Sequence, residues 1–341
     1  MLIINFVIWG VCLDNTILKK LLTEYDSKRM YKLSSLDDRK RKLMETSAEY
    51  TRLEKDLQSI SIGSLKSMLS SSPSEKEEKL RILQEKTDRA LKEKEALLKK
   101  LNLPDDYLSP NFDCKICEDT GYVNNELCFC IKQKIYDLEY NRANIGNIQS
   151  ENFSNFDFNV YSDEVNLQKY NSNFSPRDNM RKIVDISRNF IEKFDSIDEK
   201  NLVFLGSTGL GKTFLSNCIA KEIIDSGKTV LYQTAPVMLD TIINSKLQKD
   251  NSELANLVLD VDLLIIDDLG TEVMNSMHFN ELFNIINTRL LNQSSKITKT
   301  IISTNLDLKG IFKFYDERIG SRIVGNYNIC RFFGDDIRLR K

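Results

Sequence analysis

The chain has 341 residues, of which 41 % are apolar and 29 % are charged, with a formal net charge of −2. These values are typical of a soluble globular protein with about two domains and a substantial core. Because the net charge is small, any binding to nucleic acid must come from a local basic patch and not from the charge of the whole chain. The single histidine, His278, excludes most histidine-based catalysis.

The first thirteen residues, MLIINFVIWGVCL, are almost wholly apolar. This stretch is too short to span a bilayer, and it lacks the basic region and small-residue cleavage site of a signal peptide. We interpret residues 1–13 as an extension peripheral to function, with a docking segment as the alternative. Seven cysteines without a secretory signal indicate a reducing compartment, so we expect a cytoplasmic protein.

Two helix-prone segments follow the extension. Residues 15–59 are charged, with Leu and Ile at helical spacing, and residues 73–101 place leucines at an alternating three–four spacing. Thr87 and Lys94 interrupt the second stripe, which makes it imperfect as a coiled coil. We therefore expect an antiparallel helical hairpin over about 30–102, whose apolar stripe packs internally or engages a partner helix.

Four cysteines lie within 17 residues, as a C-x2-C pair and a C-x-C pair separated by ten residues: Cys114, Cys117, Cys128 and Cys130. The two pairs can approach from opposite ends of a small hairpin with Asn124-Asn125 near its turn. Four thiolates form a closed tetrahedral set, which suits structural Zn²⁺ and leaves no open position for catalysis. Four free cysteines and an iron–sulfur cluster are the alternatives. A helix over 131–144 is expected to leave this zinc knuckle.

Residues 146–178 are rich in Asn, Ser, Asp and aromatic side chains, and we interpret them as a linker. The aromatic residues resemble a base-stacking platform, but no Arg or Lys is interleaved between 151 and 168. We therefore expect them to pin the linker onto the neighbouring domain. An amphipathic helix over 179–194 precedes the next strand.

A buried strand over 202–205 leads into a phosphate-binding loop of the form G-x-x-x-x-G-K-T, and a helix follows. In such a loop the backbone N–H groups point at phosphate oxygens, and the helix N-terminus adds positive potential. Lys212 is expected to reach the β- and γ-phosphates, and the Thr213 hydroxyl to hold Mg²⁺. The predicted nucleotide-binding residues are Gly206, Ser207, Thr208, Gly209, Leu210, Gly211, Lys212 and Thr213.

Strands are predicted over 229–234 and 261–266, with a helix over 236–246 between them. The second strand ends in two carboxylates, Asp267 and Asp268, about 55 residues after the loop lysine. At the C-terminal edge of a parallel sheet the first carboxylate can organise the Mg²⁺ shell, and the second can polarise the attacking water. A surface turn is the alternative, and the spacing favours the catalytic interpretation.

Two further features complete the predicted hydrolytic site. After a helix over 279–291, the strand 300–304 ends at Asn305, which is placed to hydrogen-bond the water or the γ-phosphate, although a strand-ending Asn is also a common cap. The segment 316–323 is predicted to be a helix that carries Arg318 and Arg322 four residues apart. These arginines pair with nearby carboxylates or, in a ring or filament, reach the γ-phosphate of a neighbouring subunit.

The motifs GSTGLGKT, LLIIDDLG, IISTN and ERIGSRI, in this order, resemble those of AAA+ ATPases. The resemblance is closer to bacterial replicative helicase loaders of the DnaC/DnaI type and to their relative IstB, the transposition helper. The cysteine knuckle with DTGYV and the closing FFGDDIR resemble the loader branch of Gram-positive bacteria. The resemblance covers about 110–341.

The resemblance implies an α/β fold: a P-loop AAA+ three-layer αβα domain with a parallel sheet, preceded by a helical N-terminal domain with a small zinc knuckle. The domains expected are the extension 1–13, a helical, zinc-binding, helicase-interaction domain over 14–145, the linker 146–178 and the ATPase domain 179–341. The cofactors implied are ATP, Mg²⁺ and structural Zn²⁺.

By position, the resemblance assigns Lys212 and Thr213 to Walker A, with Asp267 as the Mg²⁺-organising carboxylate. Asp268 becomes the base, where most AAA+ proteins have Glu, and this difference implies slow, switch-like hydrolysis. Asn305 corresponds to sensor 1, and Arg322 is preferred over Arg318 as the arginine finger. The C-terminal segment is too short for a full lid domain, so Arg338 is not assigned as sensor 2.

The function implied is an ATP-dependent DNA replication protein that binds the hexameric replicative helicase and helps load it onto single-stranded DNA. ATP-dependent self-assembly is expected and membrane association is not. The alternatives are an IstB-like transposition helper, a nucleotide-gated adaptor without significant turnover, and a small-molecule P-loop kinase. Lys246, Lys249 and Lys309 are candidate DNA contacts, although they form no basic stripe with stacking aromatic residues.

Overall fold

The computed structural model describes residues 15–70, 73–139, 150–248, 253–273, 275–291 and 296–339. The chain divides into two compact units, Lys19–Glu126 and a second unit made chiefly of Leu127–Lys341. The apolar extension 1–13 lies outside the described residues. Among the helices described, none combines the length and the apolar character that crossing a membrane requires.

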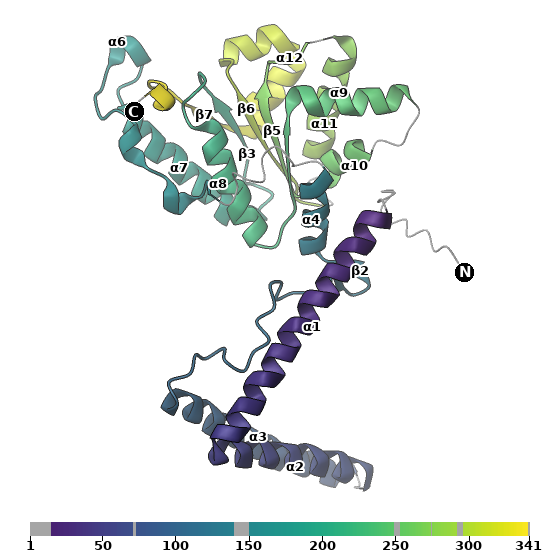
Figure 1. Cartoon of the computed structure of the whole chain (residues 1–341). Coiled ribbons are helices and arrows are strands. Elements are labelled where there is room, and N and C mark those ends of the chain that lie inside the picture. Colours follow the sequence, from purple (N-terminus) through teal and green to yellow (C-terminus); the bar gives the residue numbers. More distant parts are fainter. Residues whose placement is uncertain are drawn as a thin grey trace. The chain divides into compact units, whose positions relative to one another are not determined.

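Three long helices build most of the first unit (Figure 1): α1 (Asn15–Thr46), α2 (Ala48–Ser70) and α3 (Pro73–Lys100). Helices α2 and α3 pack against each other. The hairpin therefore begins at Ala48 and not near residue 30. The boundary has a local cause, because the Ser47 hydroxyl accepts the N–H of Tyr50 at 3.1 Å and so caps the start of α2.

A small buried cluster holds this hairpin together, formed by Leu43, Tyr50, Leu53, Leu97 and Leu98. Lys94, which interrupts the apolar stripe of α3, lies over the Tyr50 ring and forms an ion pair with Glu54. The Tyr50 hydroxyl donates to the same carboxylate at 2.7 Å. A charged residue in the stripe is thus accommodated by a partner on the facing helix.

A two-stranded hairpin, β1 (Tyr122–Val123) and β2 (Glu126–Leu127), follows the C-x2-C pair. Its turn residues Asn124 and Asn125 both have positive φ, at 50° and 66°. This conformation is typical of tight hairpin turns and agrees with the turn expected from the sequence. Helix α4 (Phe129–Glu139) then begins between the last two cysteines.

The second unit contains a five-stranded parallel sheet in the order β4-β5-β6-β3-β7 (Figure 1). The strands are β3 (Asn201–Leu205), β4 (Val230–Thr234), β5 (Leu263–Leu269), β6 (Lys299–Thr304) and β7 (Tyr327–Arg331). Every residue of β3 and β6 is buried. Strands covered on both faces are expected in a sheet flanked by helices.

Helices cover both faces of this sheet (Figure 1). On one face lie α7 (Pro176–Glu192) and α8 (Lys212–Asp225), which contact each other. On the other lie α9 (Ala235–Leu247), α10 (Glu253–Asp260), α11 (Ser276–Leu291) and α12 (Leu308–Asn326). The expected three-layer αβα fold is confirmed.

Short helical elements lie between α4 and α7, and another follows the last strand. They are η1 (Phe153–Asn155), η2 (Phe158–Val160), α6 (Leu167–Tyr170) and, after β7, η4 (Ile337–Leu339). Phe153, Phe156 and Phe158 pack against the core of the second unit, as expected of residues that pin a linker to its neighbour.

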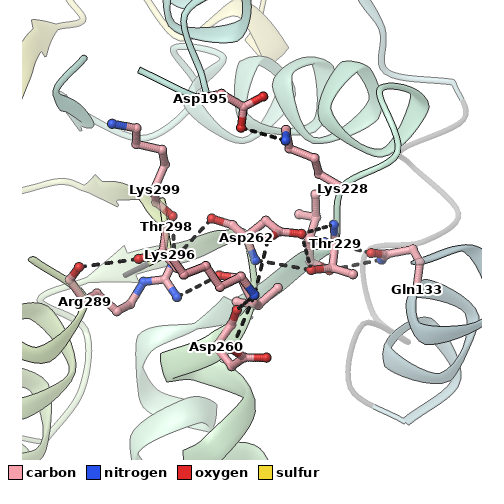
Figure 2. Close-up of polar contacts among 12 residues, drawn as sticks. Gln133, Asp195, Lys228, Thr229, Asp260, Asp262, Arg289, Lys296, Thr298 and Lys299 are labelled. Atoms are coloured by element: carbon pink, nitrogen blue, oxygen red, sulfur yellow. Dashed lines mark hydrogen bonds and ion pairs between the residues drawn. The ribbon is translucent and has the colours of Figure 1, made fainter. Parts of the chain in front are cut away.

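The edge of the sheet where β4, β5 and β6 begin is joined by a polar network (Figure 2). Arg289 of α11 is 2 % exposed, and its guanidinium donates to backbone oxygens of Val261 and Lys299 at 2.9 and 2.6 Å. Asp262 accepts both the N–H and the hydroxyl of Thr229 at 2.8 Å. This network fixes the strand starts at the end of the sheet opposite the phosphate-binding loop.

Candidate functional site

The phosphate-binding loop lies between β3 and α8, beside the point where the strand order reverses. Such a switch point is where parallel α/β sheets bind their ligands. Gly211 precedes the first turn of α8 with φ of 87°, and a Cβ atom there would lie 2.5 Å from the Tyr161 hydroxyl oxygen. Only glycine fits both the backbone conformation and the contact. The Tyr161 hydroxyl donates to the Leu210 carbonyl at 3.3 Å, so this side chain supports the loop.

Lys212 is buried, and its ammonium group is hydrogen-bonded both by the loop and by Asn305. It donates to the carbonyls of Gly206 and Ser207 at 2.6 and 2.8 Å and to Asn305 Oδ1 at 2.9 Å. Burial lowers the pKa of Lys212, while the nearby carboxylates of Asp267 and Asp268 act in the opposite direction. The side chain therefore lies between the loop and the end of β6, where phosphate oxygens of a nucleotide are expected.

Asp267 ends the buried part of β5 and lies directly beside the loop. Its Oδ2 accepts hydrogen bonds from the Thr213 hydroxyl at 3.1 Å and from the Tyr232 hydroxyl at 2.6 Å. Burial, followed by the charge of Asp267, raises the pKa of Tyr232 well above its ordinary value, so the tyrosine remains a donor. A hydroxyl and a carboxylate in this arrangement are ligands that Mg²⁺ accepts.

Asp268 follows in a different backbone conformation. The pairing of β5 with β6 shifts between Ile266 and Leu269, and Asp268 has φ of 53°, in the left-handed region. This bulge turns the Asp268 side chain outward while Asp267 stays buried. Partial desolvation and the neighbouring Asp267 charge raise the pKa of Asp268. A carboxylate with a raised pKa is a better proton acceptor than an ordinary aspartate.

Asn305 reaches the same site from the end of β6. Its side-chain oxygen accepts from Lys212, and the preceding residue, Thr304, accepts the Gly206 N–H at 3.2 Å. A cavity of about 640 Å³ opens beside these residues, and Gly206, Ser207, Asn305 and Phe333 are among those that line it. The structure thus brings 206–213, Asp267, Asp268 and Asn305 together at one end of the sheet.

The C-terminal segment after β7 also contacts the loop. The Ile337 N–H donates to the Gly209 carbonyl at 2.9 Å, and a Cβ atom on Gly209 would lie 2.0 Å from Asp336 Oδ1. Asp336 forms an ion pair with Arg338 at 2.6 Å. Because Arg338 directly follows Ile337, the contact with Gly209 also brings this arginine close to the loop.

Arg318 and Arg322 lie elsewhere, on α12 against α11. The Arg322 guanidinium lies 4.4 Å from the centre of the Phe283 ring and donates to Asn287 Oδ1 at 2.9 Å. Arg318 lies over Phe279 at 4.6 Å. Within the described residues, neither arginine forms an ion pair or hydrogen bond with the loop or with the two β5 carboxylates. The structure therefore does not bring the two predicted fingers to the site of their own chain.

The four knuckle cysteines come together as predicted from their spacing. The sulfur atoms of Cys114, Cys117, Cys128 and Cys130 all lie within 4.8 Å of one another. Four thiolates around a tetrahedral Zn²⁺ at about 2.3 Å have sulfurs about 3.8 Å apart, so the cluster fits this ion.

One side chain supports the turn that carries the first cysteine pair. The carboxylate of Asp119 accepts the N–H of Cys114 at 2.8 Å and pairs with Lys32 of α1 at 2.9 Å. The backbone of the pair is therefore held by a buried carboxylate that is itself neutralised.

Sequence reasoning missed several residues of the site. Tyr232 lies on the neighbouring strand two residues before its end, and no local motif marks it as a partner of Asp267. The contact of the closing segment with Gly209, through Asp336 and the Ile337 N–H, depends on β7 returning beside β3. The bulge at Asp268 depends on the register of β5 with β6.

Comparisons with known proteins agree with this geometry. The model of the family described as IstB-like ATP binding protein matches residues 155–339, more than half of the chain. The replicative helicase loader DnaC of Escherichia coli (strain K12) is 31 % identical over 159 residues, covering 45 % of this chain and 62 % of the loader. The chain thus spans less than two thirds of the length of that loader.

Two further matches are more distant. An insertion sequence IS232 putative ATP-binding protein of Bacillus thuringiensis subsp. berliner is 22 % identical over 227 residues, covering 64 % of this chain and 84 % of that protein. A crystal structure of the DnaC helicase loader matches with a TM-score of 0.43 and 20 % identity, covering 55 % of this chain and 98 % of that chain.

The family match contains the phosphate-binding loop, both β5 carboxylates and Asn305. The predicted resemblance to IstB and to loaders of the DnaC type is confirmed by the family match and by the loader relative. The chain belongs to the family of IstB-like ATP-binding proteins.

Proposed function

We propose that this protein is an ATP-hydrolysing loader that binds a hexameric replicative DNA helicase and helps place it on single-stranded DNA. The observation that carries the proposal is the convergence of Lys212, Thr213, Asp267, Asp268 and Asn305 at one end of the parallel sheet. The 31 % identity with the DnaC loader supports the choice of partner.

In the proposed reaction, Lys212 and the backbone amides of 206–213 bind the phosphates of ATP. Thr213 and Asp267 would hold Mg²⁺, which supplies neutralisation of phosphate charge when bound. Asp268 accepts a proton from the attacking water, and its raised pKa suits that role. Asn305 orients the water or the γ-phosphate once Lys212 turns toward the nucleotide.

We further propose that the site is completed by a second copy of the chain. Arg322, or Arg318 in its place, would contact the γ-phosphate of a neighbouring subunit. Both side chains contact residues of α11 and not the phosphate-binding loop, and these contacts support a role between subunits. ATP would then promote self-assembly, and assembly would control turnover.

The part of the chain before the ATPase domain is proposed to bind the helicase. We retain residues 14–145 as the interaction domain, 146–178 as the linker and 179–341 as the ATPase domain. Structural Zn²⁺ held by the four cysteines would fix the knuckle. Single-stranded DNA is proposed as a further ligand, and a cytoplasmic location is consistent with these roles.

The test uses the full-length, zinc-loaded protein and an immobilised replicative helicase. Wild-type protein should be retained, and ATP should change the amount retained. The Lys212→Ala variant should bind the helicase but lose ATP binding and the response to ATP. The Asp268→Asn variant should bind ATP, hydrolyse it at least about tenfold more slowly, and stay in the ATP-bound state. Absence of helicase retention in every nucleotide state would contradict the proposal.

Mixing variants tests the arginine separately. Arg322→Ala protein lacks the proposed finger, and Lys212→Ala protein lacks its own nucleotide site but keeps the finger. If the site is shared, mixing the two should restore part of the ATP turnover. No rescue at any mixing ratio would show that Arg322 does not act across subunits.

A transposition helper is the second candidate, favoured by the family match and by the IS232 relative. It would share the ATPase chemistry but bind a transposase and not a helicase. Retention of the protein by an immobilised transposase, without retention by the helicase, would favour this alternative. The four-cysteine cluster is not expected from a helper of this kind.

A further inference from the structure

A buried acid–tyrosine pair joins the turn after β5 to helix α12. Glu272 is 5 % exposed and Tyr315 is fully buried. The Tyr315 hydroxyl donates to Glu272 Oε1, and Glu272 Oε2 accepts the Gly270 N–H at 2.9 Å. Both carboxylate oxygens therefore accept a hydrogen bond, one from α12 and one from the turn after β5. The proposed hydrolysis assigns no role to either residue.

A buried carboxylate is destabilising unless it is fully hydrogen-bonded, because its charge is removed from water. The pair therefore specifies one relative placement of the two segments rather than simply filling space. Burial, followed by the hydrogen bond to Glu272, raises the pKa of Tyr315, so its hydroxyl stays protonated and donates.

The turn that follows the two β5 carboxylates, here called the Walker B turn, spans Asp268 to Thr271 and leads to this pair. Asp268 has φ of 53° and Gly270 has φ of 99°, so these two residues of the turn lie in the left-handed region. The Thr271 hydroxyl donates to the Asp268 carbonyl at 2.8 Å, which closes the turn. Because Glu272 binds the Gly270 N–H, the backbone that orients the proposed base is held by Glu272.

The arginine-bearing half of α12 begins directly after Tyr315. Asp316 has φ of 66° and interrupts the helix, and its carboxylate accepts the Arg318 N–H at 2.7 Å. The same carboxylate forms an ion pair with the Arg318 guanidinium at 3.2 Å. Two residues thus separate the anchored tyrosine from the first arginine, and Arg322 follows one turn later.

We propose that Glu272 and Tyr315 are positioning residues that couple the Walker B turn to the arginine helix of the same subunit. A shift of the turn on nucleotide binding would move Tyr315, and through the break at Asp316 it would reorient the arginines offered to the next subunit. This inference rests on the proposed ATPase function. It adds a route by which nucleotide bound at one site would set the orientation of the arginines that reach the site of the neighbouring subunit.

The alternative is that the hydrogen bond between Glu272 and Tyr315 has only a structural role and contributes to stability alone. If the role is only structural, loss of the Tyr315 hydroxyl should lower the free energy of unfolding and leave the response to nucleotide unchanged. Coupling predicts a specific loss of communication between 206–213 and 316–326. The two interpretations differ in a local observable, and Tyr315→Phe separates them because it removes one hydroxyl and keeps the ring.

The experiment measures hydrogen exchange of the full-length protein with and without a nonhydrolysable ATP analogue and Mg²⁺. In wild-type protein the analogue should slow exchange in 206–213 and change it in 316–326. In Tyr315→Phe the first response should remain and the second should be lost. Turnover of assembled Tyr315→Phe should fall about tenfold, with ATP affinity within about twofold of wild type.

Two further variants serve as a second test and as a control. Glu272→Gln keeps the size of the side chain but alters its hydrogen bonds, so it should repeat the effect if Tyr315→Phe folds poorly. Tyr50→Phe is the matched control, because Tyr50 is fully buried and its hydroxyl donates to a carboxylate of Glu54. It should leave both nucleotide responses and the turnover unchanged.

The inference is overturned if 316–326 responds to the analogue equally in Tyr315→Phe and in wild type. It is also overturned if 206–213 responds in wild type and 316–326 does not, and in that case the proposed ATP binding stands. If 206–213 shows no response in wild type, ATP binding itself fails, and the coupling that depends on it fails as well.

Discussion

Gln133 of α4 supports the edge of the sheet in a way that a single substitution can test (Figure 2). Its Nε2 donates to the Val230 carbonyl at 3.0 Å, and its Oε1 accepts the Val230 N–H at 2.7 Å. The side-chain amide thus pairs with the backbone of edge strand β4 as a neighbouring strand would. A second donation, to Asp137 at 2.8 Å, orients the amide.

The expected cost of losing this pairing follows from the two hydrogen bonds. Gln133 is 4 % exposed, so water replaces the amide poorly. At about 0.5–1.5 kcal/mol for each bond, Gln133→Ala should lower the local stability of the β4 edge by about 1–3 kcal/mol. Since about 1.4 kcal/mol corresponds to a factor of ten, exchange of the Val230 amide should accelerate by roughly 5- to 150-fold.

Native-state hydrogen exchange at Val230 is the assay, because it reports on this edge without requiring the whole chain to unfold in one step. Gln133→Glu should behave no better than Gln133→Ala, since a carboxylate cannot donate to the Val230 carbonyl and lies beside Asp137. Lys132→Ala, on the neighbouring position of the same helix, should leave the exchange within about twofold of wild type. Unchanged exchange in both Gln133 variants would refute the reasoning.

Two other predictions concern the carboxylate pair and the cysteine cluster. The pKa of Asp268 is raised above 3.8, so ATP turnover should decline with falling pH before an ordinary aspartate would be protonated. A turnover rate that stays constant down to pH 3.8 would contradict its role as base. Because the pKa is higher in the folded state, ionised Asp268 lowers the free energy of unfolding at neutral pH. This destabilisation disappears as the pH falls through the raised pKa. Asp268→Asn should therefore be at least as stable as wild type at pH 7 in urea unfolding. Purified protein should contain about one Zn²⁺ per chain by metal analysis, and Cys130→Ser should lower this content while Cys218→Ala, in the core of the second unit, should not. Equal zinc content in wild type and Cys130→Ser would rule out the four-cysteine site.

The features that local patterns encode were predicted well from the sequence. A short apolar strand, a glycine-rich loop and an amphipathic helix are continuous in the chain, so the position of Lys212 could be placed without any long-range information. The same is true of Asp267, because the buried run of β5 ends at that residue. The four cysteines were found by spacing alone, and their sulfurs are gathered as that spacing requires.

The features that were missed depend on partners distant in the chain. Strand β7 carries only five residues with mixed exposure, and its identity depends on pairing with β3. The break in α12 was missed because Asp316 has a positive φ that helical periodicity does not reveal. The hairpin was predicted to start too early because residues 30–46 share the charged, helix-prone character of the segment after Ser47.

The conformation of Lys212 links the nucleotide site to the end of β6. An ammonium group has three N–H donors, and here they bind two loop carbonyls and Asn305 Oδ1. Anionic phosphate oxygens form stronger, charge-assisted hydrogen bonds than these neutral acceptors do. A nucleotide would therefore draw the ammonium away from Asn305, whose amide then becomes available to a water or to the γ-phosphate. The hydrogen bond between Lys212 and Asn305 therefore connects the residue that is proposed to bind the phosphate with the residue that is proposed to detect it.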